Sequence, residues 1–277
     1  MKILLLGKSG LLGQALFSAL QTEHEVVGFS HAQCDVTQES SLEDVFAKTS
    51  PDLVINATGY TQVDKAEEEK DLAFEVNKKA VSNIIKLLKP KNTPLVHFST
   101  DYVFNGENTA GYTENDFQAP LSVYGASKAA GEAEIIKNLK NYYLIRTAWL
   151  YGPGGKNFVD TMLLLAEKRA PIKVVNDQIG NPTLSTDLAQ SVLRLLKGKS
   201  YGIYHLVNEG DVSWYDFAVA IFENLGVPQK VMSITTAELN RPAHRPHYSM
   251  LRNTKFEKLR PWQEALAAYL KEKTLIL

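Results

Sequence analysis

Residues 1–20, MKILLLGKSGLLGQALFSAL, indicate how the chain begins to fold. Residues 2–6 form an aliphatic run that ends at Gly7, which is typical of a strand buried on both faces. After it, Leu12, Leu16 and Leu20 recur every four residues, so one face of the segment is apolar when it is helical. The stretch therefore predicts a strand, a glycine turn and a helix.

Similar units follow along the chain. Short apolar runs at 25–29, 53–57, 95–99 and 143–148 alternate with helical patterns at 72–88 and 127–139. Strands buried on both faces and separated by helices favour a parallel sheet that helices cover on both sides. We therefore predict an α/β fold with a Rossmann-like, doubly wound parallel sheet.

After Tyr151 the pattern becomes less regular, and we predict a smaller α/β substrate-binding region there. The loop GPGGKN (152–157) precedes a helix over 158–168, and VVNDQIGNPT (174–183) is polar and rich in turn residues. Further elements are predicted as helices at 185–197 and 214–225, a strand at 202–207 and an extended arm at 241–249. We expect a first domain of residues 1–150, to which 184–205 return, and a second domain of residues 151–183 and 206–277.

Composition argues against some classes of partner. The 30 basic and 31 acidic residues leave a net charge of −1, so no general field attracts nucleic acid or an anionic membrane. The apolar run near the start is too short for a signal peptide or a membrane span. Cys34 is the only cysteine, which suits a reducing compartment. We expect a cytoplasmic globular protein that binds neither nucleic acid nor membrane.

The glycine turn is the first candidate binding feature. Gly7, Gly10 and Gly13 form a GxxGxxG pattern between the predicted strand and helix. Backbone without side chains can approach a pyrophosphate closely, and the N–H groups and dipole of the helix then bind the anion. The simpler alternative is that these glycines serve only turn geometry and helix packing.

The end of the second predicted strand bears on the choice of cofactor. It reads GFSHAQ (28–33), with Ser30 and His31 but no acid to bind the adenosine ribose hydroxyls. The missing acid favours a 2′-phosphate and hence NADPH or NADP, with NADH as the alternative. Lys8 and His31 are the candidate partners of that phosphate. Asp35 either reaches the adenine edge or caps the following segment.

Tyr124 and Lys128 are the candidate acid–base pair. They lie four residues apart at the start of a predicted helix, so both side chains project from one face. An adjacent ammonium stabilises phenolate, so we expect Lys128 to lower the pKa of Tyr124 towards neutrality. Ser99 and Thr100 follow a buried strand, which places Thr100 to hydrogen-bond a substrate carbonyl. The alternatives are chance spacing on an amphipathic helix and ordinary turn capping.

Longer motifs carry a resemblance to a known family. They are GKSGLLG (7–13), NATGYTQVDKAE (56–67), STDYVFNG (99–106), YGASKAAGE (124–132), RTAWLYG (146–152), NDQIGNPT (176–183) and RPHYSMLRNTKF (245–256). In this order they resemble the dTDP-4-dehydrorhamnose reductases, of the extended short-chain dehydrogenase/reductases, nearly from end to end. The resemblance implies reduction of the 4-keto group of dTDP-4-dehydro-L-rhamnose to dTDP-L-rhamnose by NADPH, in the synthesis of rhamnose for cell-surface polysaccharide.

The resemblance also implies roles for single residues. Thr100, Tyr124 and Lys128 match the catalytic residues of the family, with Tyr124 as the proton donor. The residues that we expect at the sugar are Thr61, Val63, Asp64, Thr100, Asp101, Tyr102, Tyr124 and Trp149. Those that we expect at the cofactor are Gly7, Ser9, Gly10, Leu11, Leu12, Gly13, Ser30, His31, Asp35, Val36, Ala57, Thr58, Gly59, Asn77, Ser99, Tyr124 and Lys128. For each of them the alternative is ordinary turn or core packing.

Basic residues and a polar loop complete the expected substrate site. We expect the loop 178–183 to lie near the substrate. The thymidine diphosphate needs cations, because its phosphate oxygens carry negative charge. The candidates, each of which is otherwise a solvated surface residue, are Arg241, Arg245, Arg252 and Lys156.

The chain also departs from part of the family pattern. Some members resemble magnesium-bridged dimers with an acidic side chain just after the glycine turn, where this chain has Gln14. We therefore expect no metal and a monomer, with a homodimer as the alternative. His244 and His247 lie among prolines and arginines, which indicates a cationic loop rather than a metal pair. Two other functions stay open: another nucleotide-sugar epimerase or dehydratase, and a non-catalytic NADP-binding regulatory subunit.

Overall fold

A parallel sheet of six strands forms the centre of the computed structural model, which describes residues 1–167, 171–198 and 200–274. In spatial order the strands are β10 (Gly202–His205), β5 (Tyr142–Thr147), β4 (Leu95–Thr100), β3 (Leu53–Asn56), β1 (Lys2–Leu6) and β2 (Glu25–Phe29). Each neighbouring pair runs parallel. The chain reverses its direction of winding between β1 and β3, which confirms the predicted doubly wound fold.

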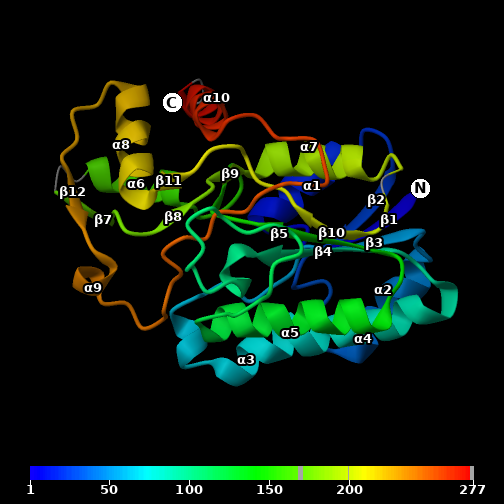
Figure 1. Cartoon of the computed structure of the whole chain (residues 1–277). Helices are drawn as coiled ribbons and strands as arrows, with labels where there is room; N and C mark the ends of the chain where they lie inside the picture. The colour runs from blue at the N-terminus through cyan, green and yellow to red at the C-terminus, as the bar shows by residue number, and fades with distance from the viewer. Residues whose placement is uncertain (168–170, 199, 275–277) are drawn as a thin grey trace.

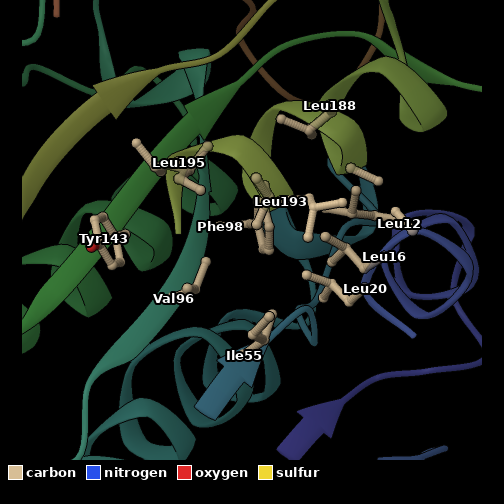
Figure 2. Close-up of a cluster of buried hydrophobic side chains, with 14 of the residues drawn as sticks. Leu12, Leu16, Leu20, Ile55, Val96, Phe98, Tyr143, Leu188, Leu193 and Leu195 are labelled. Carbon is tan, nitrogen blue, oxygen red and sulfur yellow. The ribbon is translucent and has the colours of Figure 1, made fainter. Parts of the chain in front are cut away.

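Helices cover both faces of this sheet (Figure 1). On one face lie α1 (Leu11–Leu20) and α7 (Ser185–Leu195), and on the other α2 (Glu39–Thr49), α3 (Lys70–Phe74), α4 (Ala80–Leu88) and α5 (Val123–Asn138). The alternation of β1 explains the two layers: Ile3 and Leu5 pack with α1 and α7, whereas Leu4 and Leu6 pack in the opposite core. Figure 2 shows the first of these cores.

The smaller region has a core of its own. Its helices are α6 (Phe158–Glu167), α8 (Trp214–Leu225), α9 (Thr236–Leu239) and α10 (Trp262–Thr274). Three two-stranded sheets connect them: β6 (Leu150–Tyr151) with β9 (Thr183–Leu184), β7 (Ile172–Val175) with β12 (Val231–Ile234), and β8 (Ile179–Gly180) with β11 (Val212–Ser213). Tyr151, Phe217 and Trp262 are among the side chains that fill this core.

The segment expected to return to the first domain lies against it. Residues 185–195 form α7 beside α1, and β10 pairs with β5 at the edge of the sheet. The later residues Phe256 and Leu259 also pack against the core of α1 and α7. We propose that the Rossmann domain comprises 1–150 with 184–205, and that the second domain comprises 151–183 and 206–274; residues 275–277, expected in the latter, lie outside the described residues.

Several element boundaries differ from the prediction. The expected helix over 72–88 is interrupted by a π-helical segment, Glu75–Lys79, at the buried Asn77. Helix α5 begins at Val123 rather than at 127, because the side chain of Ser122 accepts a hydrogen bond from the N–H of Gly125 at 3.2 Å. Helices α2, α9 and α10 were not predicted. Helix α6 was expected to reach Lys168, which lies outside the described residues.

Within the described part of the chain, no helix combines the length and the apolar character that crossing a membrane requires.

Candidate active site

Two adjoining cavities lie at the carboxyl ends of the sheet strands. The glycine-turn cavity, of about 450 Å³, is lined by the ends of β1, β2 and β3. The tyrosine cavity, of about 400 Å³, is lined by the ends of β3, β4 and β5 together with α5. Residues lining both cavities are Gly10, Ala57, Thr58, Gly59 and Thr61. The two cavities therefore form one cleft at the place where doubly wound folds bind ligands.

Most of the predicted site residues line this cleft. Those at the glycine-turn cavity are Gly7, Ser9, Gly10, His31, Asp35, Val36, Ala57, Thr58, Gly59 and Thr61. Those at the tyrosine cavity include Leu11, Leu12, Ser99, Thr100, Asp101, Tyr124, Lys128, Trp149 and Lys156. The remaining predicted residues, Gly13, Ser30, Val63, Asp64, Asn77 and Tyr102, do not line either cavity.

The glycine turn has a steric explanation at two positions and an open space at the third. Gly7 has φ +86°, a conformation that favours glycine. A Cβ on Gly13 would lie 2.0 Å from the carbonyl oxygen of Gly7, so only glycine lets α1 pack this closely. A Cβ on Gly10 would meet nothing nearer than 3.5 Å. The first turn of α1 has no acidic residue, and Gly10 provides no side-chain cap, so this space fits a phosphate group.

The end of β2 contributes to the glycine-turn cavity only in part. His31, Asp35 and Val36 line it, whereas Ser30 uses its hydroxyl in a 3.0 Å bond to Gln33 Oε1. Burial tends to raise the pKa of Asp35, but hydrogen bonds from Thr37 outweigh it and lower that pKa.

Lys8 was expected beside His31 but lies elsewhere. Its Nζ is 3.7 Å from the ring centroid of Phe17, and its aliphatic chain covers Gly28. Of the two basic residues that we suggested for a 2′-phosphate, only His31 lines the cavity.

Three side chains meet in the tyrosine cavity. Thr100 ends β4, and α5 carries Tyr124 and Lys128 in its first two turns. The Thr100 hydroxyl donates to Asp101 Oδ1 at 2.9 Å, accepts from the N–H of Tyr102 at 3.2 Å and contacts the Tyr124 phenol. Burial raises the pKa of Asp101 to about 6, although hydrogen bonds from Ser249 and Thr100 act to lower it.

The pKa expected for Tyr124 was wrong for the protein without a ligand. Burial raises the pKa of Tyr124 to about 12, and the negative charge of Asp101 contributes to this increase. The hydrogen bond with Thr100 acts in the opposite direction. Lys128 is not among the groups that shift this pKa, and its Nζ donates to the carbonyl of Phe98 at 2.6 Å. Burial lowers the pKa of Lys128 to about 8, against the opposing charge of Glu132.

Buried polar groups support this arrangement from behind. Asn77 accepts from the N–H of Tyr60 at 2.9 Å and donates to Ser127 Oγ at 2.9 Å, so it fixes the β3 loop against α5. Glu132, one turn after Lys128, forms a fully buried ion pair with Arg146 on β5, with a shortest distance of 2.7 Å. A buried pair of this kind fixes geometry more surely than it adds stability.

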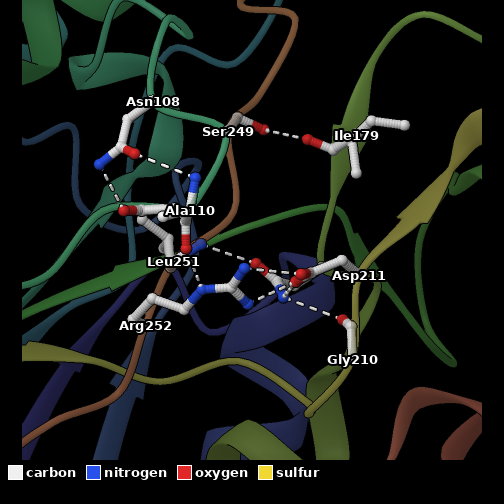
Figure 3. A network of polar contacts seen from close by, with 10 residues as sticks. Asn108, Ala110, Ile179, Gly210, Asp211, Ser249, Leu251 and Arg252 are labelled. Carbon is white, nitrogen blue, oxygen red and sulfur yellow. Dashed lines mark hydrogen bonds and ion pairs between the residues drawn. The ribbon is translucent and has the colours of Figure 1, made fainter.

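The basic residues suggested for the thymidine diphosphate separate into different surroundings. Arg245 forms a two-bonded ion pair with Asp64, at 2.8 and 2.9 Å, and this pairing lowers the pKa of Asp64. Arg241 lies 3.9 Å from the same carboxylate. Arg252 pairs with Asp211 at 2.7 Å and lines a third cavity, and Figure 3 shows this network. Only Lys156 lines the tyrosine cavity.

Trp149, near the end of the first domain, lines the tyrosine cavity and packs against the core of the second region. Its ring stacks on Trp214 with centroids 3.6 Å apart. The loop 178–183 contributes Gly180, which lies against the same ring.

His247, suggested as part of a cationic loop, bonds through Nδ1 to the carbonyl of Asp177 at 2.7 Å. Among the residues that the structure describes, no group of three or more His, Cys, Asp or Glu side chains is arranged to hold a metal ion.

Sequence patterns missed several residues of the cleft. Tyr60, Gln62, Leu72 and Val76 line the glycine-turn cavity, and Phe98, Thr147 and Leu150 line the tyrosine cavity. The available signal for most of them was position: Tyr60, Gln62, Thr147 and Leu150 lie inside the quoted motifs, and Phe98 directly precedes one. Nothing local marks Leu72, a half-exposed residue of α3.

Comparison with known proteins places the chain in a family. The model of the RmlD substrate binding domain matches residues 1–275. The chain is 40% identical to the spore coat polysaccharide biosynthesis protein SpsK of Bacillus subtilis (99% of this chain, 98% of that protein) and 39% identical to the dTDP-4-dehydrorhamnose reductase of Aggregatibacter actinomycetemcomitans (96% and 97%).

A solved structure gives the same result. The dTDP-4-dehydrorhamnose reductase of Bacillus anthracis in complex with NADP has a TM-score of 0.95 at 36% identity, covering 98% of this chain and 99% of that one. An epimerase of Thermus thermophilus, at 19% identity, shares the fold alone. Motif order, cleft geometry and full-length similarity agree, and the chain therefore belongs to the dTDP-4-dehydrorhamnose reductase family.

Proposed function

We propose that this protein is an NADPH-dependent reductase that converts the 4-keto group of dTDP-4-dehydro-L-rhamnose into the hydroxyl of dTDP-L-rhamnose. One observation carries the proposal most strongly: Thr100, Tyr124 and Lys128 share one cavity, and that cavity continues into the glycine turn. A dinucleotide bound along the turn thus reaches the phenol that supplies a proton. The names of full-length relatives supply the identity of the sugar.

The roles proposed for the protein's own groups follow from their contacts. NADPH bound in the cleft supplies the hydride. Tyr124, whose raised pKa of about 12 keeps the phenol protonated, donates its proton to the oxygen at C4. Thr100 contacts the same phenol and hydrogen-bonds the oxygen. Lys128, held by the carbonyl of Phe98, provides positive charge beside the nicotinamide ribose.

The open space above Gly10 supports the proposed position of the cofactor diphosphate. A Cβ there would meet no protein atom within 3.4 Å, so packing alone does not require glycine. The N-terminus of α1 has no side-chain cap, so its N–H groups can bind an anion. His31, Asp35 and Val36 are then the proposed neighbours of the adenosine half.

We also propose that the chain acts as a cytoplasmic monomer. Gln14 stands at the place where a metal-bridged dimer needs an acid, and its side chain forms hydrogen bonds within this chain. Its Nε2 donates to the carbonyl oxygens of Ser9 at 2.9 Å and Gly154 at 2.7 Å. Sedimentation analysis with and without magnesium tests this proposal, and a magnesium-dependent dimer contradicts it.

Measuring cofactor oxidation and sugar product in the same reaction tests the activity. Purified protein is mixed with dTDP-4-dehydro-L-rhamnose and either NADPH or NADH, and both cofactor oxidation and the sugar product are followed. We expect stoichiometric oxidation and dTDP-L-rhamnose, faster with NADPH. No substrate-dependent oxidation with either cofactor excludes the reductase. A tightly retained cofactor that returns to its starting state after each turnover favours an epimerase or dehydratase instead, and cofactor binding without turnover favours a regulatory subunit.

A second keto sugar belongs in the same assay. A relative of 38% identity from Streptomyces antibioticus is named a probable 4-ketoreductase of dTDP-4,6-dihydroxy-2-methyloxan-3-one. That substrate has the same nucleotide and the same reacting position. Higher kcat/KM for it than for dTDP-4-dehydro-L-rhamnose contradicts the proposed sugar while retaining the reaction.

A further inference from the structure

Trp149 occupies an unusual position for a large residue. It lies two residues after the end of β5 and directly before β6, and its backbone has φ +45°, in the left-handed region where bulky side chains are rare. Its ring lines the tyrosine cavity together with Thr100 and Tyr124. A strained residue at a cavity persists only where its neighbours fix it.

Two neighbours fix the indole ring. Trp214 stacks on it with ring centroids 3.6 Å apart and an interplanar angle of 7°. Gly180 lies against the same ring, since a Cβ there would be 2.5 Å from Cε2, 2.7 Å from Cζ2 and 2.7 Å from Nε1. The absence of a side chain at Gly180 therefore leaves room for the indole.

Strand pairing brings these two neighbours together. In the β8–β11 sheet Gly180 pairs with Val212, two residues before Trp214. Ser213 caps α8 by accepting from the N–H of Asp216 at 3.0 Å, which fixes the direction in which the helix leaves the strand. Phe158 also packs against Trp214, with its ring centroid 4.5 Å from that of Trp214. The stack is thus anchored in the core of the second region.

From this geometry we propose that Trp214 and Gly180 are positioning residues that hold the Trp149 indole as the wall against which the sugar binds. The inference rests on the proposed function, because it assigns the tyrosine cavity to the sugar. It goes further in making sugar affinity depend on two residues outside the cavity. Neither residue lines the tyrosine cavity, so both act in this proposal through the indole of Trp149.

Two variants disturb the indole from different elements. Trp214→Leu removes the stacking partner, and Gly180→Ala places a methyl group against the ring. For both we expect binding of dTDP-L-rhamnose, measured by calorimetry, to weaken about three- to tenfold, in line with the strength of aromatic contacts. Binding of dTDP alone and of NADPH should stay within about twofold. In turnover, KM for the keto sugar should rise while kcat changes little.

Matched controls separate positioning from general damage. Trp214→Phe keeps a stacked ring and should retain affinity within about twofold. Leu266→Ala creates a cavity in the same core, because Leu266 is fully buried, and should lower the melting temperature without changing the affinity ratio of dTDP-L-rhamnose to dTDP.

Each remaining outcome overturns a stated idea. Equal weakening of dTDP and dTDP-L-rhamnose, no change in either, or a similar loss in Leu266→Ala overturns the positioning role. Failure of the wild-type protein to bind or turn over the sugar nucleotide overturns the proposed function instead. The two failures are therefore distinguishable.

Discussion

The two walls of the tyrosine cavity are built in different ways. On the Rossmann side, Thr100, Tyr124 and Lys128 come from the end of a buried strand and the start of a capped helix. On the opposite side, Trp149 has a left-handed backbone conformation and Lys156 lies in the loop before α6. Regular elements thus position the groups proposed for chemistry, whereas long-range contacts position the groups proposed for binding.

This difference predicts separate effects on the reaction. The Rossmann wall contacts the reacting carbonyl in the proposed complex, so changes there should lower kcat. The second wall contacts the parts of the ligands that do not react, so changes there should mainly raise KM. Substitutions on the two sides can therefore sharpen the comparison or refute it.

The largest effect is expected for Tyr124→Phe. The variant keeps the ring that packs edge-on against Tyr102, at 5.8 Å, but removes the only proton that the phenol can donate. We expect kcat to fall by about 10²- to 10⁴-fold, the usual range for a general acid, while NADPH affinity stays within about twofold. Steady-state kinetics and fluorescence titration of NADPH measure the two quantities. Wild-type kcat in the variant would refute the role of Tyr124 and the contrast between the walls.

The next effect distinguishes two glycines of the same turn. A Cβ on Gly13 would lie 2.0 Å from the Gly7 carbonyl, whereas a Cβ on Gly10 would meet nothing within 3.4 Å. We expect Gly13→Ala to destabilise the fold by about 1–3 kcal/mol or more. Gly10→Ala should keep its melting temperature but weaken NADPH binding about tenfold or more, because the methyl group enters the proposed diphosphate site.

Thermal denaturation and NADPH titration of both variants test this pair. Gly13→Ala is the stability control for Gly10→Ala. If Gly10→Ala binds NADPH as the wild type does, the space above Gly10 does not hold the diphosphate.

Sequence patterns predicted the Rossmann wall better than the second wall for a physical reason. Tyr124 and Lys128 lie on one face of one helix, so their proximity follows from helix geometry. The Trp149–Trp214 stack behind the second wall joins residues 65 positions apart and depends on the pairing of two short strands. Such a contact leaves no periodic pattern in the sequence. The pKa of Tyr124 was mispredicted because residue spacing does not report how deeply the phenol is buried.

A smaller effect is expected for Lys156→Met on the second wall. Lys156 shares its cavity with Gly10, Leu11 and Leu12, and Gly155 lies so close to α1 that a Cβ would be 2.9 Å from Leu11 Cβ. This position favours the cofactor diphosphate over the thymidine diphosphate. We expect NADPH to bind about fivefold more weakly, and dTDP unchanged, because one exposed charge–phosphate contact is lost.

Titration of the Lys156→Met variant with NADPH and with dTDP decides which of the two diphosphates Lys156 contacts. Lys258→Met, at the separate cavity beside Arg252, is the matched charge control and should change neither affinity. Weaker dTDP binding with unchanged NADPH binding would assign Lys156 to the substrate.

The smallest effect concerns the cost of burying Lys128. Burial lowers its pKa in the folded protein to about 8, below the value of about 10.4 expected in the unfolded chain. Between these values the unfolded state binds more protons, so this residue's contribution to stability rises with pH and is lost as pH falls through about 8. From pH 7 to 9 the wild type should gain about 1 kcal/mol relative to Lys128→Met in urea unfolding, whereas exposed Lys156→Met should parallel the wild type. If the free energy of unfolding changes with pH in the same way for all three proteins, burial of the Lys128 charge has no measurable cost in stability.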